Sequence, residues 1–160
     1  GEMPTMTDHR TSQQTFAEFH ATAETRLRRA LVARYGGEVG REATAEALAY
    51  AWENWGRVEQ MSNPLGYLYR VGQSRSRRLW PRRSVFEVRP QSDFPWVEPG
   101  LPAALNKLSA RQRQAVVLVH SFEYTHQEVA DLLGISRSSV QNHVERGLAK
   151  LRSDLEVTDV

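Results

Sequence analysis

A run of polar side chains near the carboxyl end has the residue types and spacing of a nucleic-acid reading surface. Val140 and Val144 lie four residues apart, as on one face of a helix, so the residues between them point outward. Arginine pairs with guanine edges, asparagine and glutamine pair with adenine, and hydroxyl groups bind phosphate. We therefore predict that the major groove of a duplex is contacted by Arg137, Ser138, Ser139, Gln141, Asn142, His143 and Arg146.

A second segment joins aromatic rings to arginines. Residues 62–90 hold seven arginines and one acid, whereas residues 1–60 hold seven arginines and nine acids. This local charge, on a chain of net charge +2, indicates a polyanionic partner; a solvated arginine-rich face is the alternative. Rings that stack on bases and cations that follow the backbone suit single-stranded DNA. Tyr67 and Tyr69 are two residues apart and cannot share a helix face, so at most one of them stacks.

Three helices are predicted to position this second segment. Apolar residues spaced three and four apart begin near residue 14 and end at Gly36-Gly37, and a second such run extends from about Arg41 to Trp55. Asn63-Pro64 has the form of an N-cap followed by proline at the first position of a third helix. Residues 1–13 are expected to be a disordered or non-native tail.

Proline separates these helices from a second set. Five of the seven prolines lie within residues 81–102, which favours an extended linker. Ser109 with Gln112, and Thr125 with Glu128, each have the spacing of a capping box at the start of a helix. Gly134 is placed to end the second of these helices in the left-handed conformation.

The last two helices form a predicted helix-turn-helix. Ser136 is expected to cap the final helix, whose apolar stripe faces the preceding short helix. An ordinary helical hairpin with a polar surface is the alternative interpretation. The apolar plug between the two helices is predicted to consist of Val129, Leu133, Ile135, Val140 and Val144.

Several classes of function are disfavoured by composition. The chain has no cysteine, which fits a reducing cytoplasm and removes thiolate metal sites, and its apolar runs are too short to cross a membrane. His126 and His143 lack the spacing of a metal pair. Because no nucleophile elbow or phosphate-binding glycine loop is present, we predict no catalytic residue, cofactor, metal or small-molecule substrate, and we do not expect an enzyme.

These residues resemble a known family. Residues 108–118, 124–136 and 139–152 closely resemble region 4 of bacterial RNA polymerase sigma factors of the small extracytoplasmic-function type. The resemblance implies that the final helix reads the −35 promoter element. Where the family often has a basic residue in that helix, this chain has His143.

The first half resembles sigma region 2 more loosely. Residues 51–55 and 63–72 are similar to the end of the family's polymerase-binding helix and to its −10-reading helix. Glu42 stands at the position of the family's key acid, and Ala45 stands where the family usually has glutamine. The resemblance implies polymerase contacts from Glu42, Glu46, Trp52 and Trp55. It implies contacts with melted −10 DNA from Asn63, Tyr67, Arg70, Gln73, Ser74, Arg77 and Arg78.

The sequence therefore predicts an all-α protein with two small domains. A three-helix region 2 domain at residues 14–83 is joined by a proline-rich linker at 84–102 to a region 4 helix-turn-helix domain at 103–156. The expected partners are core RNA polymerase, promoter DNA in duplex and single-stranded form, and an anti-sigma or accessory regulator, in the cytoplasm and away from membranes. A sigma-derived helix-turn-helix regulator that does not act with polymerase is the alternative.

Overall fold

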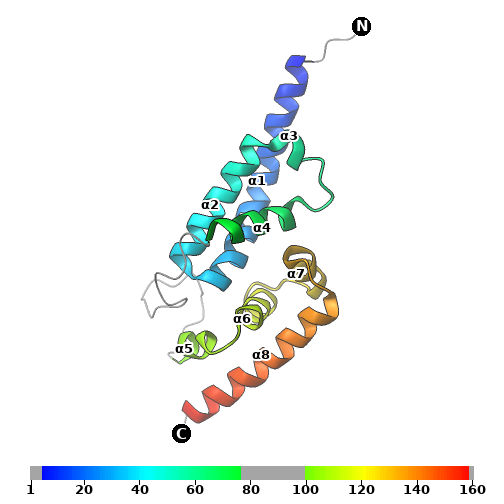
Figure 1. Ribbon diagram of the computed structural model, residues 1–160. Helices are drawn as coiled ribbons and strands as arrows, with labels where there is room; N and C mark the ends of the chain where they lie inside the picture. The colour runs from blue at the N-terminus through cyan, green and yellow to red at the C-terminus, as the bar shows by residue number, and fades with distance from the viewer. Residues whose placement is uncertain (1–4, 77–99, 159–160) are drawn as a thin grey trace.

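The part of the chain that the structure describes consists of helices joined by short turns and loops (Figure 1). The structure is a computed structural model that describes residues 5–76 and 100–158, with side chains described for 16–76 and 100–155. In chain order the elements are α1 (Thr5–Tyr35), α2 (Gly37–Glu53), α3 (Trp55–Val58), α4 (Pro64–Ser76), α5 (Leu101–Asn106), α6 (Ala110–Val116), the π-helical turn η1 (Val117–Ser121), α7 (His126–Leu133) and α8 (Arg137–Thr158).

The first half of the chain is a bundle of α1, α2 and α4, as predicted. Leu27 and Leu31 of α1 and Leu68 of α4 are fully buried in its core. A Cβ built on Gly40 of α2 would lie 2.6 Å from the backbone of Val32 in α1. The missing side chain at Gly40 therefore allows α1 and α2 to approach closely, which fixes the base on which α4 rests.

Two helix boundaries in this half differ from the prediction. Helix α1 already begins at Thr5, so residues 5–13, which we predicted to be a tail, are helical. Helix α2 begins at Gly37 rather than near Arg41. The physical reason is Gly36, whose φ of 91° turns the chain within one residue.

The predicted second helix is divided in two. Helix α2 ends at Glu53, and Asn54 leaves the helical conformation while its side-chain amide donates to the carbonyl of Tyr50 at 3.0 Å. Trp55 then begins the short helix α3. A polar side chain that bonds the nearby backbone thus interrupts a continuous apolar pattern.

The second half contains α5 to α8. Helix α5 was not predicted, and it takes Leu101 and Pro102 out of the expected linker because proline fits the first turn of a helix. Residues 77–99, which include the predicted end of the third helix and most of the linker, lie outside the described residues.

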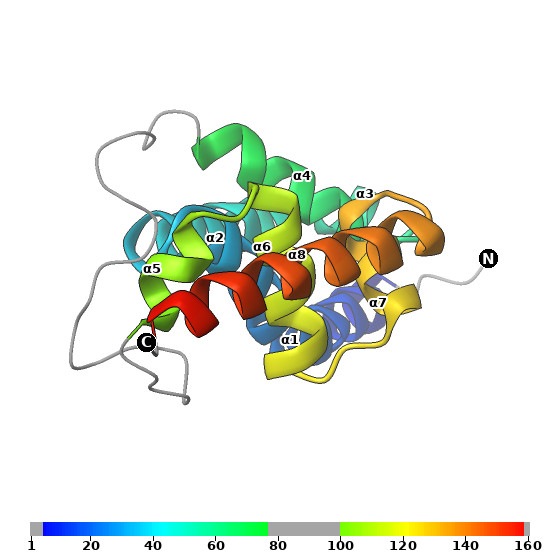
Figure 2. The same ribbon diagram turned by 90° about the horizontal axis from the view of Figure 1, so that it is seen from below.

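The two halves share one hydrophobic core. Leu118, Val129 and Val140 of the second half lie in the same buried cluster as Leu31 and Leu68 of the first. Figure 2 shows α6 as a layer between α8 and the first bundle, which agrees with its contacts to α8 and α1. The two predicted domains are therefore packed together.

Hydrogen bonds from polar side chains also connect the two halves of the chain. Gln114 of α6 is fully buried, and its Nε2 donates to the carbonyl of Ala30 at 3.0 Å and to the hydroxyl of Tyr69. The neighbouring Arg113 donates to two carbonyls at the end of α1. We call Arg113 and Gln114 the interdomain latch. Because buried polar groups need matched partners, the latch ties α6 to one position on α1.

The turn before α7 holds one strained residue. Glu123 is the one non-glycine residue with positive φ among those described, at 61°. The left-handed conformation costs an ordinary residue about 1–2 kcal/mol, and glycine at this position would remove that cost. The greater flexibility of glycine in the unfolded chain offsets part of the resulting gain in stability. We expect Glu123→Gly to raise the free energy of unfolding by about 0.5–1 kcal/mol in urea denaturation. Glu123→Ala is the control; an equal gain from alanine would contradict the backbone explanation.

No helix within residues 5–76 or 100–158 has the length and apolar character needed to span a membrane.

Candidate nucleic-acid interface

The helix-turn-helix is built by local hydrogen bonds that the sequence predicted. The Thr125 side chain accepts from the Glu128 amide at 3.0 Å, while a Glu128 oxygen accepts from the Thr125 amide at 3.0 Å. Gly134 ends α7 in the left-handed conformation, with φ 71°. The Ser136 hydroxyl then accepts from the Ser139 amide at 3.1 Å and caps α8. Both capping predictions and the glycine prediction are confirmed.

The predicted apolar plug is also confirmed. Val129, Leu133, Val140 and Val144 are buried, and Ile135 packs against them half-buried. This packing leaves the opposite face of α8 to solvent. On that face five of the predicted residues are exposed and two are half-buried: Arg137, Ser138, Gln141, Asn142 and Arg146 are exposed, and Ser139 and His143 are half-buried.

Hydroxyl groups gather at the start of α8. The Ser136 Oγ lies 3.2 Å from that of Ser138 and 3.0 Å from that of Ser139. They surround the positive end of the helix dipole, where unpaired amides favour an anion such as a phosphate oxygen. One turn later the Gln141 amide donates to Glu145 at 3.2 Å, so base contact through Gln141 requires that bond to be exchanged.

The positive charges of two arginines act on His143. Burial, followed by the charges of Arg111 in α6 and Arg146 in α8, lowers the pKa of His143. The imidazole is therefore neutral at neutral pH and can both donate to and accept from a base edge. Arg111 was not among the predicted DNA contacts; only packing of α6 against α8 brings its charge to this face.

The lowered pKa of His143 has a consequence for stability. In the unfolded chain a histidine titrates near 6.5, so below about pH 6.5 the unfolded state takes up the proton first. Well above that pH, His143 therefore does not change the free energy of unfolding. As the pH falls, proton uptake by the unfolded state lowers the free energy of unfolding progressively. Replacing His143 with glutamine should flatten the pH dependence of the free energy of unfolding between about pH 5.5 and 7.5, measured by urea denaturation. A wild-type protein that gains stability relative to the variant on acidification would contradict this.

The predicted −10 residue Asn63 contacts both halves. Its Oδ1 accepts from the Gly66 amide at 3.1 Å and caps α4, as predicted, while its Nδ2 donates to the carbonyl of Asp131 in α7 at 2.8 Å. Arg70 is exposed and reaches the turn of the helix-turn-helix, where its Nη1 would lie 3.5 Å from a Cβ on Gly134. Two −10 candidates thus lie against α7 and the turn that leads into α8.

The remaining −10 candidates lie on or beyond α4. Tyr67 and Gln73 are half-buried and Ser74 is exposed, whereas Tyr69 is 1% exposed and belongs to the core. The two tyrosines therefore lie on different faces, as predicted. Arg77 and Arg78 lie outside the described residues.

The predicted polymerase contacts occupy different environments. Glu42 is exposed and Glu46 is half-buried. Trp52 is 53% exposed and is the one large apolar side chain that is exposed among the described residues. Trp55 is instead 7% exposed and packs on Phe16 in the core, so its indole is not presented to a partner. The two tryptophans are three residues apart in what the sequence predicted as one helix, so both were expected on the same face.

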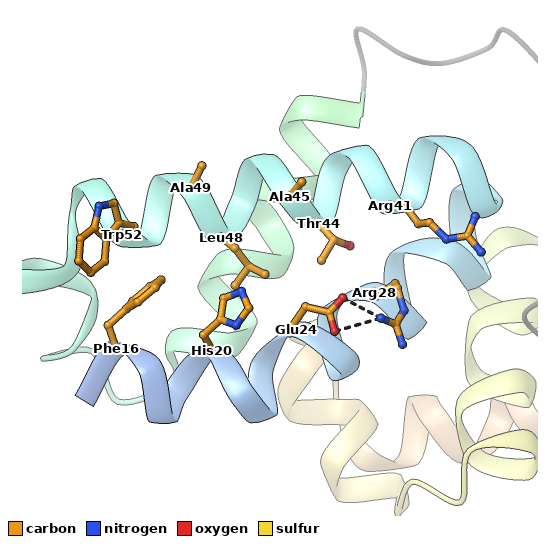
Figure 3. Close-up of a pocket in the computed structure, with 10 residues that line it drawn as sticks. All are labelled: Phe16, His20, Glu24, Arg28, Arg41, Thr44, Ala45, Leu48, Ala49 and Trp52. Atoms are coloured by element: carbon orange, nitrogen blue, oxygen red, sulfur yellow. Dashed lines mark hydrogen bonds and ion pairs between the residues drawn. The ribbon is translucent and has the colours of Figure 1, made fainter. Parts of the chain in front are cut away.

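A groove of about 640 Å³ runs beside Trp52 between α1 and α2 (Figure 3). Phe16 and Trp52 stand at one end with their ring centroids 4.9 Å apart. At the other end lie Arg41 and Arg28, which is paired with Glu24 at 2.7 Å. The groove therefore offers an apolar end and a charged end on one open face.

The comparisons with known proteins agree with this arrangement. A family model described as Sigma-70, region 4 matches residues 100–151. The RNA polymerase sigma-E factor of Streptomyces antibioticus is 31% identical over 125 residues, which cover 71% of this chain and 69% of that protein. The RNA polymerase sigma-E factor of Streptomyces coelicolor is 30% identical over 124 residues, covering 71% and 70%.

This chain belongs to the RNA polymerase sigma factor family. Its fold is also that of a solved sigma factor, RpoE of Bartonella quintana in complex with the anti-sigma factor NepR, with a TM-score of 0.65 and 19% identity over 90% of this chain and 98% of that one. The all-α prediction and the resemblance to sigma factors are thus confirmed. Within residues 5–76 and 100–158 of this sigma factor, no three His, Asp or Glu side chains are grouped to hold a metal ion.

Proposed function

We propose that this sigma factor binds core RNA polymerase and directs it to promoters, with α8 reading the −35 duplex and α4 holding the melted −10 strand. The observation that carries the proposal is the exposed polar face of α8 in a capped helix-turn-helix. The other helix of that motif, α7, contacts α4, which carries rings and arginines. Protein–DNA contacts of this kind require no catalytic group, so the chain acts as a specificity subunit and not as an enzyme.

The two halves of the chain pack against each other, which we call the closed arrangement. They have to separate for both promoter elements to be read together. Their names place the elements about 25 base pairs apart, which is about 85 Å at 3.4 Å per base pair. Helix α8, with its 22 residues, is only about 33 Å long, and Asn63 beside α4 is in hydrogen-bond contact with α7. We infer that the closed form is that of the free protein and that polymerase holds the halves apart.

The further partner that we propose is an anti-sigma or accessory regulator. The solved sigma factor of the same fold was determined in complex with an anti-sigma factor. A regulator of this kind would act in the cytoplasm, where polymerase and promoters are, by favouring the closed arrangement.

Transcription with purified components tests the proposal. Core polymerase is incubated with genomic promoter fragments, with and without the full chain, and transcript starts are mapped. Defined starts that depend on the chain, together with its co-purification with core enzyme at physiological salt, are expected. Specific binding to duplex DNA without core binding or initiation would favour a regulator that does not act with polymerase.

A further inference from the structure

One acid lies among the basic and polar side chains that α8 exposes. Glu145 is exposed, as are Gln141 and Asn142 in the turn before it. Within residues 137–147, which make up about the first three turns of α8, Glu145 is the one acid. It lies four residues after Gln141 and three after Asn142, so all three side chains share the face that the apolar stripe of α8 leaves to solvent. Glu145 was not among the DNA contacts predicted from the sequence.

Gln141 holds the carboxylate of Glu145 in one place. The Nε2 of Gln141 donates to the Oε1 of Glu145 at 3.2 Å. Because a carboxylate only accepts hydrogen bonds, the amide has to turn its NH2 group toward Glu145. The second carboxylate oxygen, Oε2, can then accept a further hydrogen bond from a partner. We call Gln141 and Glu145 the acceptor pair, since together they present acceptors to solvent.

The charge of Glu145 decides which part of a duplex it can contact. Phosphates repel a carboxylate, and the exposed Arg137 and Arg146 of the same helix are the groups that suit them. In the major groove, guanine presents two acceptors, thymine presents an acceptor and a methyl group, and adenine presents a donor beside an acceptor. Cytosine presents its N4 amino donor alone. A group that only accepts therefore matches cytosine best and is repelled by guanine and thymine.

The face that carries the acceptor pair is open in the closed arrangement. Figures 1 and 2 show α8 as the outermost helix of the second half, which agrees with its contacts to α5, α6 and α7 on its inner side. A duplex can therefore approach Glu145 without separation of the two halves, and the free chain can be tested as well as its complex with polymerase.

We propose that Glu145 reads one cytosine of the promoter duplex by accepting a hydrogen bond from its N4 amino group, with Gln141 as the positioning residue. The sequence had predicted that Gln141 contacts DNA directly. With the bond of the acceptor pair kept, Gln141 instead acts through Glu145. This inference rests on the proposed reading of duplex DNA by α8, and it names a base and a residue that the sequence did not predict.

The test measures base preference with the full chain and core polymerase. Promoter fragments are randomised over about ten base pairs, one turn of duplex, upstream of the −10 element, and bound fragments are sequenced. Wild type should prefer cytosine over thymine at one base pair by roughly 5- to 100-fold. Glu145→Ala should abolish this preference and keep those at other base pairs. Glu145→Gln should admit thymine, because an amide can also donate to its O4.

Two outcomes would overturn the reading role of Glu145. One is the absence of any cytosine preference that depends on Glu145. The other is a Glu145→Ala variant that binds every fragment more tightly by one common factor, because the acid would then only repel phosphates.

Gln141→Ala tests the positioning role. It should weaken the preference for the same cytosine and leave the thermal midpoint unchanged, since the side chain of Gln141 is exposed. If Gln141→Ala instead lost an adenine preference at another base pair and kept the cytosine preference, Gln141 would read a base by itself and the positioning role would fall.

Helix α7 offers a matched control. The Nε2 of Gln127 donates to the Oδ1 of Asp131 at 2.9 Å, which is the same kind of pair at the same spacing, and both residues are exposed. The first helix of a helix-turn-helix crosses the DNA backbone, whereas the second reads base edges. Asp131→Ala should therefore change the affinity for all fragments by one factor. Loss of the cytosine preference in this variant too would assign the effect to general charge and overturn the proposal.

A second arm separates this inference from the proposed function. The free chain is titrated with the selected duplex and with the same duplex in which the C·G pair is replaced by T·A. If the chain did not bind core polymerase but discriminated between these duplexes through Glu145, the polymerase role would fall and the inference would stand. If polymerase with this chain started transcripts at defined promoters without a Glu145-dependent cytosine preference, the function would stand and the inference would fall.

Discussion

Replacing Arg113 with methionine is expected to lower the free energy of unfolding by about 2–4 kcal/mol, a large effect for one side chain remote from any DNA-reading face. Arg113 is 5% exposed, although it is charged. Its Nε donates to the carbonyl of Ala33 at 2.8 Å and its Nη2 to that of Arg34 at 2.7 Å, at the end of α1. Burial, together with the charge of Arg34, lowers the pKa of Arg113 to about 10, so it remains protonated at neutral pH.

The loss has two physical sources. The last carbonyls of a helix have no partner within the helix, and here a cation from the other half supplies the donor at the negative end of the helix dipole. Methionine would fill a similar volume but leave two carbonyls without that donor. Urea denaturation of the full chain measures the stability, and small-angle X-ray scattering measures whether the halves separate.

A surface pair provides the matched control. Arg28 is paired with Glu24 at 2.7 Å, but both side chains are about one-third exposed, so Arg28→Met should cost less than about 1 kcal/mol. Equal stability of the two variants, with no expansion of the Arg113 variant, would contradict the role that we assign to the latch.

Trp52→Ala is expected to weaken binding to core polymerase by about 30-fold or more while leaving the fold intact. An exposed tryptophan beside a groove is the type of residue that dominates protein interfaces, where its truncation commonly costs about 2 kcal/mol or more. Trp52 is 53% exposed, so its removal leaves no large cavity in the core. Labelled protein titrated with core enzyme gives the affinity, and thermal unfolding checks the fold.

Trp55 is the contrasting position three residues away. It is 7% exposed and its ring lies 5.1 Å from that of Phe19, so Trp55→Ala should lower stability by about 3–5 kcal/mol. A Trp52→Ala variant that binds core polymerase as tightly as wild type would remove this face from the proposed interface.

The sequence by itself determined the local structure of the reading head. The capping boxes at Ser109 and Thr125 and the left-handed Gly134 were all predicted correctly. Each depends on hydrogen bonds or backbone conformations within about four residues, and such short-range geometry follows from residue type and spacing. The face of α8 turned to solvent followed for the same reason, because the apolar stripe fixes the opposite side.

The tertiary structure alone decided which distant residues meet. Apolar periodicity shows that a face is covered but not what covers it, so the sequence did not separate core Trp55 from exposed Trp52. The same limit hid the contact of Arg113 with α1 and the effect of Arg111 on His143. These pairs lie on separate helices, and their distances depend on how whole helices pack, which involves long-range contacts that no local pattern encodes.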